Sequence, residues 1–437
     1  MSAITSPLAR IVIVLMICVL HLVIAPAQSV ATTQQPKSAY EHLDLFSDVL
    51  YLVQKNYVEP VAMETMVQGA INGMLEELDP HSEYMNPEMF AELEIETTGE
   101  FCGLGIEITI KDRTITVIAP IDDTPADCAG IKAGDKIIKI DDKFTKDISI
   151  MEAVQMMRGE KGSQITIGVM REKQKHPLEF TLMRQIIRIE SIKQQYYQSA
   201  LGYIRITQFQ KRTAKDLRDA LSSLGKKSGG TLQGLVLDLR NNPGGLLDQA
   251  VKVADLFLDS GDIVSTRGRQ EKDNSIYHAT PWQKDQQPDY PIVILINGGS
   301  ASAAEIVAGA LQDQHRAIIL GTQSFGKGSV QSLIPLNDKS GMRLTTAHYY
   351  TPNGTSIQAL GITPDIVVEQ ATWHTAPDSK IREKDLDNHF ETPDNSTENT
   401  QPVKHKKWTK TAASDYQLLR ALDLLRGWQQ LKILSDQ

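Results

Sequence analysis

Three short, continuously apolar segments in the second half of the chain constrain its fold most strongly. They are Gly234–Leu239, Ile292–Ile296 and Ala317–Leu320, with helical spacing at Leu246–Leu256 and Ala303–Leu311 after the first two. A strand that is apolar at successive positions has to be covered on at least one face, which is typical of sheets flanked by helices. The sequence therefore predicts an α/β core over residues 186–370.

The region before this core has a different pattern. Residues 38–97 contain helical stretches, one from Ala39 and a second over Met63–Leu78, in which apolar residues recur every three or four positions. Residues 98–185 instead alternate apolar and polar positions, which is typical of short strands. Within this second region we expect two helices, at Pro125–Ala129 and Ile150–Met157.

Both ends of the chain predict segments outside the folded regions. Residues 1–27 carry an apolar run from Ile11 to Ala25 followed by small residues, the pattern of a secretory signal peptide. The run is shorter than the roughly 20 apolar residues that span a membrane. We therefore expect an exported protein, in the periplasm or at the outer face of the cytoplasmic membrane, with an uncleaved anchor as the alternative. Residues 371–412 have the polar composition of a linker, and residues 413–437 form an amphipathic helix.

Composition argues against several classes of function. The net charge of −9 disfavours nucleic acid as the main ligand, because a phosphate backbone requires clustered Lys and Arg. Cys18 lies in the signal, which leaves Cys102 and Cys128, and neither has a nearby His or a C-x-x-C partner. We expect both to be small buried apolar residues, without metal binding or thiol catalysis. Their spacing alone leaves a disulfide between them open.

The segment after Ile292–Ile296 is a candidate catalytic turn. It reads Asn-Gly-Gly-Ser-Ala-Ser over residues 297–302 and leads into a helix. Such a turn places a hydroxyl at the end of a sheet, beside the free N–H groups of the first helical turn, which can stabilise an oxyanion. The alternative is structural, because Ser302-x-x-Glu305 is also a capping box. Ser300 is an equal candidate for the nucleophile.

A second glycine-rich segment supplies a candidate base. Residues 321–328 nearly match the phosphate-binding loop G-x-x-x-x-G-K-[ST], but Gly328 replaces the required hydroxyl and a strand pattern follows, which argues against a nucleotide site. Lys327 lies between glycines and beside Phe325, where an apolar pocket would lower its pKa and make it a usable base. The alternative is a solvated lysine in a turn. Spacing alone does not bring Lys327 near Ser302.

Taken together, these two segments resemble the signatures of the carboxyl-terminal processing peptidases, also called tail-specific proteases. These are Ser/Lys hydrolases with an embedded PDZ domain. Further stretches that resemble the family are Leu78–Ser82, Gly103–Ile106, Asp238–Gly245, Tyr350–Gly354 and Gly361–Asp365. The resemblance covers about Tyr40 to Val368. It implies a crotonase-like protease core at residues 186–370, with an inserted PDZ domain at residues 98–185 and an N-terminal helical region at residues 38–97.

The resemblance also implies roles for individual residues. The nucleophile falls on Ser302 rather than Ser300, the base falls on Lys327, and Gln331 matches the glutamine that positions the lysine. The oxyanion N–H groups are expected from Gly244, Gly245 and Ala303. Three positions depart from the usual pattern of the family, and none of them removes a catalytic group: Cys102, where glycine is common, Ala304, where serine is common, and Ser324, where threonine is common.

The PDZ-like segment has its own expected site. The loop Gly103-Leu104-Gly105-Ile106 would present backbone N–H groups to a terminal carboxylate, and the strand after it would add an extended peptide by β-augmentation. The helix Ile150–Met157 would form the other wall of the groove. By analogy, Arg158 would relay occupancy of this groove to the protease core. Without the resemblance, the loop would be interpreted as a plain hairpin turn.

These expectations combine into an exported serine endopeptidase that recognises C-terminal tails through its PDZ domain and cleaves them through an acyl-enzyme. No cofactor or metal is expected. The expected partners are proteins or peptides with free, apolar C-termini, with an adaptor protein and a homodimer through the N-terminal helices and the Tyr416–Leu431 helix as further candidates. Two alternatives stay open: a catalytically latent PDZ scaffold that binds C-terminal peptides, and a crotonase-like acyl-thioester enzyme that binds coenzyme A.

Overall fold

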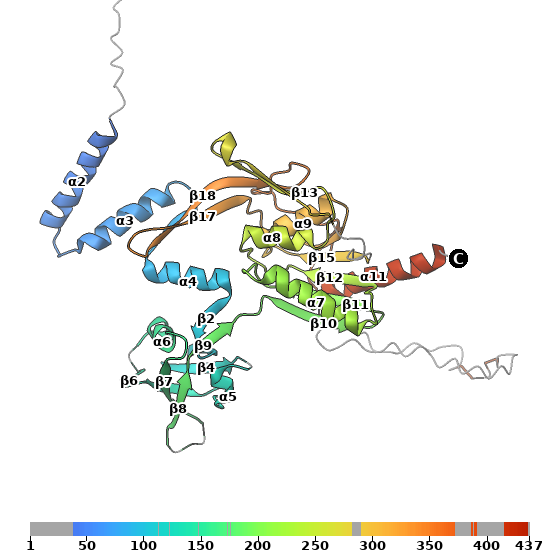
Figure 1. Ribbon diagram of the computed structural model, residues 1–437, viewed down its shortest axis with the longest axis horizontal. Coiled ribbons are helices and arrows are strands. Elements are labelled where there is room, and N and C mark those ends of the chain that lie inside the picture. The colour runs from blue at the N-terminus through green and yellow to red at the C-terminus, as the bar shows by residue number, and fades with distance from the viewer. Residues whose placement is uncertain are drawn as a thin grey trace, which may run out of the picture. The chain divides into compact units, whose positions relative to one another are not determined.

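The computed structural model of the protein describes residues 38–435 except 112, 122, 147, 173, 175, 282–289, 372–385, 388 and 391–414 (Figure 1). The expected signal peptide at residues 1–27 and most of the expected linker at 371–412 therefore lie outside the described residues. The chain forms two units, residues 1–73 and 74–437, which are considered separately below. Within the described ranges, no helix is long and apolar enough to cross a membrane.

The first unit consists of helices with little core of their own. Helix α2 spans Ala39–Asn56 and begins at Ser38, whose Oγ accepts a hydrogen bond from the backbone N–H of Glu41 at 3.3 Å. Helix α3 spans Met63–Glu76 and continues into the second unit. Both helices were expected from the spacing of apolar residues. Helix α2 has no buried residue, so its apolar side chains face solvent.

The alternating segment of the sequence forms a small sheet with helices. Its strands pair in the order β3–β4–β5–β7–β8, with β6 on β5. They are β3 (Ile106–Lys111), β4 (Thr114–Pro120), β5 (Lys136–Ile140), β6 (Lys143–Phe144), β7 (Gln164–Met170) and β8 (Leu178–Met183). Helices α5 (Pro125–Cys128) and α6 (Ile150–Met157) lie where the sequence predicts them. Side chains such as Ile137, Ile167 and Val169 form a separate core.

The chain enters and leaves this domain through two paired strands. Strand β2 (Glu100–Gly103) follows helix α4 (Pro87–Thr98) and pairs antiparallel with β9 (Gln185–Arg188). Cys102 on β2 is partly exposed, and Cys128, at the last position of α5, is exposed; both are free thiols. The expectation that both cysteines are buried is therefore wrong for Cys128, because the short helix turns that side chain towards solvent.

The three apolar runs form neighbouring parallel strands of the main sheet. Its order is β10–β11–β12–β15–β16–β19, parallel from β11 onwards. The strands are β10 (Ile192–Tyr197), β11 (Leu201–Ile206), β12 (Gly234–Asp238), β15 (Ile292–Ile296), β16 (Ile318–Gly321) and β19 (Ile366–Val367). Every residue of β12 and β15 is buried. The mixed α/β core expected from these runs is confirmed.

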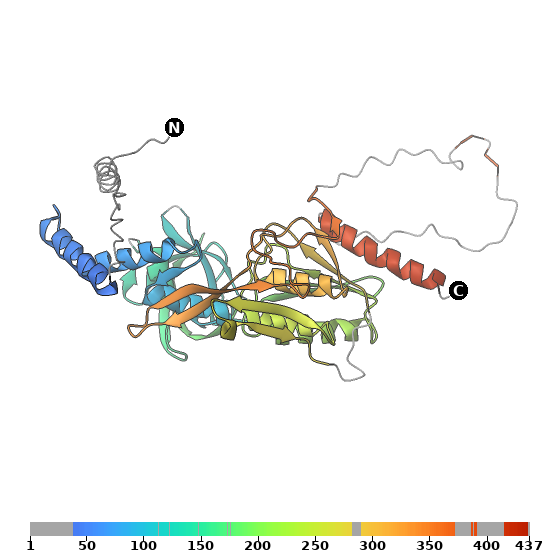
Figure 2. The same cartoon turned by 90° about the horizontal axis from the view of Figure 1, so that it is seen from above.

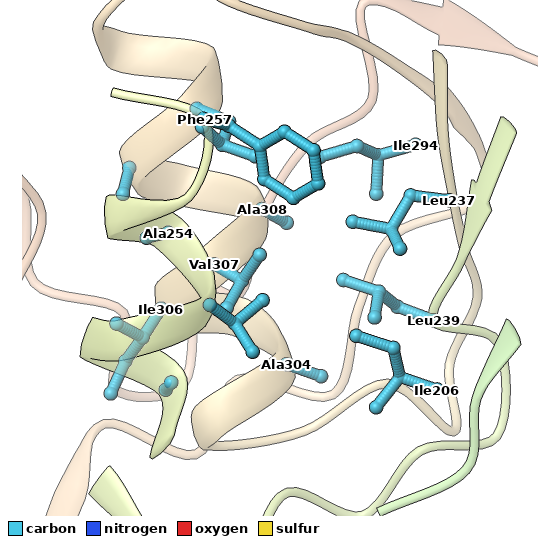
Figure 3. Close-up of a cluster of buried hydrophobic side chains, with 14 of the residues drawn as sticks. Ile206, Leu237, Leu239, Ala254, Phe257, Ile294, Ala304, Ile306, Val307 and Ala308 are labelled. Atoms are coloured by element: carbon cyan, nitrogen blue, oxygen red, sulfur yellow. The ribbon is translucent and has the colours of Figure 1, made fainter. Parts of the chain in front are cut away.

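Helices cover both faces of this sheet, which explains the unbroken apolar runs. One face packs against α7 (Thr213–Lys227), α8 (Leu247–Asp255) and α9 (Ala303–Asp313). Figure 3 shows Ala304, Val307 and Ala308 of α9 directed towards Leu237, Leu239 and Ile294. The other face packs against α11 (Tyr416–Ser435) through Leu418, Leu422 and Leu425. Figure 2 shows the C-terminal part of α11 extending beyond the strands that its first turns cover.

A second sheet carries the chain that follows the candidate base. Strand β18 (Gly341–Tyr350) is at its centre and pairs with β17 (Ser329–Pro335), β13 (Asp262–Gly268) and β1 (Glu83–Met85), and β13 also pairs with β14 (Ser275–His278). In this register Glu83 lies opposite Arg343. The segment before β1 is thereby held against the strands that follow Lys327.

Candidate active site

The turn between β15 and α9 is fixed by hydrogen bonds of its own asparagine. Oδ1 of Asn297 accepts the backbone N–H of Gly299 at 3.0 Å and that of Asn241 at 2.9 Å. The turn ends at Ser302, which has φ +53° and ψ −115°. A positive φ is strained for a serine, and strain of this kind clusters at functional sites. A sharp strand-to-helix turn is also the geometry that presents a nucleophilic hydroxyl at the end of a sheet.

The two serines of the turn have different environments. Ser300 is fully buried. Its Oγ donates to the carbonyl of Leu239 at 2.8 Å and accepts the N–H of Asn297 at 3.0 Å. Ser302 is partly exposed. Because the Ser300 hydroxyl is already committed to holding the turn, Ser302 is the accessible hydroxyl.

One buried carboxylate joins the serine turn to the lysine loop. Glu305, which is fully buried, accepts the backbone N–H of Ser302 at 2.8 Å, as one half of the expected capping box. It also accepts the hydroxyl of Ser324 at 2.6 Å and the backbone N–H groups of Gly326 and Lys327 at 2.7 and 2.9 Å. The backbones of Ser302 and Lys327 are therefore held on the same carboxylate. The sequence gives no local signal for this link, since the lysine lies 22 residues further along the chain.

The side chain of Lys327 is partly buried, and its pKa is lowered. Burial is the main cause, and the positive charge of Arg343 adds to it, whereas the negative charges of Asp79 and Glu83 oppose it. The prediction that Phe325 forms an apolar pocket around Lys327 is wrong, because Phe325 is 61% exposed. Both side chains are in the part of the chain that the structure describes, and no hydrogen bond there joins Lys327 Nζ to Ser302 Oγ.

Tyr349 contacts both candidate catalytic residues and was missed by the sequence analysis. It is buried, its hydroxyl donates to the backbone carbonyl of Lys327, and it hydrogen-bonds to the side chain of Ser302. Burial raises the pKa of Tyr349, the hydrogen bond with Ser302 lowers it, and the charge of Glu305 raises it. The phenol is therefore a neutral hydrogen-bonding group at neutral pH. The only hint in the sequence was its position directly before the stretch Tyr350–Gly354.

The stretch Leu78–Ser82 lies near the lysine. Oδ1 of Asp79 accepts the backbone N–H groups of His81 and Ser82 at 2.8 and 2.9 Å, which closes a tight turn. The pKa of His81 is lowered by burial and then by the charge of Lys327. Arg343, which donates to the carbonyl of His81 at 3.3 Å, also pairs with Glu83 at 2.7 Å. These charged groups form the electrostatic surroundings of the candidate base.

The expected oxyanion turn lies directly against Ser302, the candidate nucleophile. Gly244 has φ +105°, and a Cβ added there would lie 2.7 Å from the Cβ of Ser302, so the position requires glycine. The backbone N–H of Gly244 donates to Oδ1 of Asn242 at 2.9 Å and is therefore engaged. Within the described ranges, the N–H groups of Gly245 and Ala303 donate no hydrogen bond. These two groups are available to an oxyanion.

Gln331 takes a different partner from the expected one. Its Nε2 donates to the hydroxyl of Ser329 at 3.0 Å, two residues away on β17. A role in positioning Lys327 thus stays a prediction. Within the described part of the chain, no three or more His, Cys, Asp or Glu side chains gather in a way that could hold a metal ion.

The expected peptide loop of the small domain is held by its carbonyl groups. The Gly105 carbonyl accepts the N–H of Ile121 at 2.9 Å, and the Leu104 carbonyl accepts the N–H of Ala126 at 3.1 Å. Ile106 begins β3, which is an edge strand of its sheet, next to α6.

Arg158 connects this small domain to α4. It lies at the C-terminal end of α6, and its guanidinium pairs with both carboxylate oxygens of Glu92 on α4, at 3.1 Å for the Nη2–Oε1 contact. The same guanidinium lies 5.4 Å from the centre of the Phe101 ring, on β2. These contacts link the end of α6 to the helix that directly follows β1.

Comparison with known proteins gives consistent matches along the chain. Residues 200–368 match the sequence model of peptidase family S41, residues 102–182 that of a PDZ domain, and residues 21–89 that of the N-terminal domain of the activating protease CtpB. A carboxy-terminal-processing protease of Bartonella bacilliformis is 46% identical over 407 residues, which is 92% of each chain. A carboxyl-terminal-processing protease of Synechocystis is 39% identical and covers 73% of this chain and 75% of its own length. Among solved structures, the photosystem II D1 C-terminal processing protease is 30% identical over 76% of this chain and 94% of that chain, with a TM-score of 0.43.

Proposed function

Because this chain belongs to the S41 family of carboxy-terminal processing serine proteases, we propose that it cleaves protein tails with Ser302 as nucleophile and Lys327 as general base. The observation that carries this proposal is the Glu305 carboxylate, which accepts the backbone N–H groups of both residues. Ser302 also supplies the accessible hydroxyl of its turn, since the hydroxyl of Ser300 is buried and hydrogen-bonded to the backbone.

In the proposed mechanism, neutral Lys327 accepts the proton of Ser302 Oγ as that oxygen attacks the scissile carbonyl carbon. The tetrahedral oxyanion accepts hydrogen bonds from the N–H groups of Gly245 and Ala303. The C–N bond then breaks, and the leaving amine takes the proton from Lys327. Water, deprotonated by Lys327, then attacks the acyl carbon. The ester C–O bond to Ser302 breaks, and Ser302 Oγ takes the proton back from Lys327. The lowered pKa of Lys327 supports the first step, because it increases the neutral fraction of the amine.

We further propose that the PDZ domain selects the tail. The edge strand β3 supports this, because an extended peptide can add to its free side while the loop Gly103–Ile106 receives the terminal carboxylate. Arg158 would report an occupied groove to the protease core, since its partner Glu92 lies on the helix between β2 and β1. Apolar tails suit a groove between a strand and a helix.

Export and self-association are proposals that rest on different features. The pattern of residues 1–27 supports export to the periplasm or to the outer face of the cytoplasmic membrane. A homodimer is supported by helix α2, which buries none of its side chains, and by the exposed Trp428, Leu431 and Leu434 at the end of α11. Light scattering of the purified chain tests the dimer, and a monomeric mass at micromolar concentration would exclude it.

The central experiment is cleavage of an unstructured reporter that ends in apolar residues. Native protein should cleave it, and Ser302→Ala and Lys327→Ala should each lose activity by about a thousandfold or more. Equal activity in all three proteins would rule out the proposed pair. No cleavage by the native protein, together with binding of the tail, would favour a PDZ scaffold. Binding of coenzyme A in a titration would favour the acyl-thioester alternative.

A further inference from the structure

A buried cluster of charged side chains lies where the start of α11 meets the segment that leads from β12 to the Gly244–Gly245 turn. Its centre is Arg240, whose side chain is 8% exposed. Asp238, fully buried, accepts the Nε of Arg240 at 2.9 Å and its Nη2 at 2.6 Å. Asp415, which lies 175 residues further along the chain, accepts Nη1 at 2.9 Å and Nη2 at 2.6 Å. Each of the two carboxylates therefore makes a bidentate pair with the guanidinium, which fixes the orientation of the Arg240 side chain.

Arg240 lies between β12 and the Gly244–Gly245 turn. Residues on either side of it in the chain make hydrogen bonds to the serine turn. The carbonyl of Leu239 accepts the hydroxyl of Ser300 at 2.8 Å, and the carbonyl of Asn242 accepts the N–H of Ala301 at 2.9 Å. A shift of the backbone at Arg240 would therefore move both sides of the oxyanion site.

Asp415 is itself held in place, so it can serve as a support. Its Oδ1 accepts the backbone N–H of Leu418 at 3.1 Å, which caps α11. Gln417 donates to the carbonyl of Val368 at 2.7 Å and accepts Nη1 of Arg240 at 3.0 Å. The next turns of α11 bury Leu418, Leu422 and Leu425 against the sheet. The start of α11 is therefore anchored on the core at several points.

We propose that Asp415 is a positioning residue for the oxyanion site, acting through Arg240 on the Gly244–Gly245 turn. The start of the C-terminal helix would then position the oxyanion site through this one side chain. Asp238 is only two residues from Arg240 and lies at the end of β12, so it binds the guanidinium from the same segment. Asp415 binds the guanidinium from a separate element, at the start of α11. This inference rests on the proposed function for its kinetic readout, but its structural readout does not depend on any activity.

The test uses Asp415→Asn in the full chain, compared with Asp423→Asn. Asparagine caps helices as well as aspartate does, so the variant keeps the start of α11. It removes the negative charge and replaces one of the two oxygens that accept from Arg240 by an NH2 group. Asp423 lies on the same helix in an exposed pair with Arg420 at 2.6 Å and is the matched control. We expect kcat on the reporter to fall about tenfold in Asp415→Asn with KM within about twofold, because the turn is misplaced and not the tail. Asp423→Asn should match the native protein in both constants.

Hydrogen exchange of the backbone amides provides the readout that is independent of catalysis. In Asp415→Asn, exchange should accelerate at the hydrogen-bonded N–H groups of Asn241, Asn242 and Gly244. Acceleration confined to α11 would overturn the proposal, because Asp415 would then only hold its own helix. A kcat equal to that of Asp423→Asn would overturn it too. If the native protein fails to cleave any reporter, the proposed function fails, while the exchange pattern still decides this inference.

A double variant tests whether the effect passes through Arg240. Arg240→Lys keeps the positive charge and loses the bidentate fork. If Asp415 acts through Arg240, the double variant with Asp415→Asn should have about the same kcat as Arg240→Lys alone, since the two changes break one connection. Losses that multiply would show two independent effects and would contradict the proposed route.

Discussion

The serine turn and the lysine loop share the Glu305 carboxylate but are held in different ways. The turn at residues 297–302 is fixed by the Asn297 side chain, which accepts the N–H of Asn241, and by the buried hydroxyl of Ser300, and its last residue has a strained backbone. In the lysine loop, the Glu305 carboxylate holds the Ser324 hydroxyl and the backbone N–H groups of Gly326 and Lys327. The ammonium group of Lys327 instead lies among charges from other elements. The comparison indicates that the proposed nucleophile depends on rigid geometry, whereas the proposed base depends on electrostatic surroundings that can be tuned.

The largest effect is expected at the closest contact of the serine turn. In Gly244→Ala, the new Cβ would lie 2.7 Å from the Cβ of Ser302 at a φ of +105°. We expect cleavage to fall by about a hundredfold or more, because a displacement of this size at the reacting centre removes the attack geometry. Gly229→Ala is the control, since Gly229 also has a positive φ but open space around its Cβ position. It should cost only about 1 kcal/mol of stability and leave kcat/KM unchanged; equal losses in both variants would contradict the close-contact explanation.

The next largest effect is expected at Glu305, whose carboxylate holds both the serine turn and the lysine loop. Glu305→Gln replaces one acceptor oxygen by an NH2 group that faces backbone N–H donors, so about 2–4 kcal/mol of unfolding free energy should be lost. Both segments should loosen together, which hydrogen exchange at Ser302 and Lys327 would reveal. Glu179→Gln, at an exposed position of β8, is the control and should be neutral. Loosening of only one segment would show that the carboxylate does not couple them.

A smaller effect separates the two serines. Ser300→Ala leaves the carbonyl of Leu239 and the N–H of Asn297 without their buried partner, which should cost about 1–3 kcal/mol of unfolding free energy while cleavage persists below the melting temperature. Ser302→Ala should do the reverse, with stability kept and cleavage lost. Thermal denaturation and the reporter assay, run on both variants, check this. Cleavage by Ser302→Ala but not by Ser300→Ala would reverse the assignment of the nucleophile.

The smallest effect is expected in the pH dependence of cleavage, which should follow the protonation of Lys327. Cleavage should rise with pH as Lys327 loses its proton, with a midpoint below the ordinary lysine range, because burial and then the charge of Arg343 lower the pKa of Lys327. Arg343→Gln removes a positive charge and also frees Glu83 from its partner. Both changes raise the pKa of Lys327, so the kcat/KM profile should move to higher pH. Arg343→Lys keeps the charge and should stay close to the native profile, and a midpoint unchanged in Arg343→Gln would exclude this electrostatic role.

The sequence predicted those features whose signal is local. The strands Gly234–Asp238 and Ile292–Ile296 follow from apolar runs that are covered on both faces, and the pairing of Glu305 with the Ser302 N–H follows from a spacing of three residues. These features need only short stretches of chain, in which backbone geometry and solvent exclusion decide the structure.

Contacts between distant segments were not predictable in this way. The reach of Glu305 to Lys327, the packing of Tyr349 against both candidate catalytic residues and the pairing of Asp415 with Arg240 have no periodic pattern. Phe325 was wrongly assigned to the lysine pocket because adjacency in a glycine-rich loop does not determine which way a side chain points. The family resemblance favoured Ser302 over Ser300 as the candidate nucleophile, and the hydrogen bonds of the buried Ser300 hydroxyl support that prediction.

The pairing of β2 with β9 also has a consequence for how such a chain can change over time. Because Glu100 lies opposite Arg188 and Gly103 opposite Gln185, the small domain begins and ends at one point of the chain path. A module whose two ends meet can be gained, lost or exchanged as a cassette without altering the distance that the flanking segments must bridge. If the small domain selects the tail, as proposed, recombination at these two strands would change substrate choice and leave the protease core unchanged.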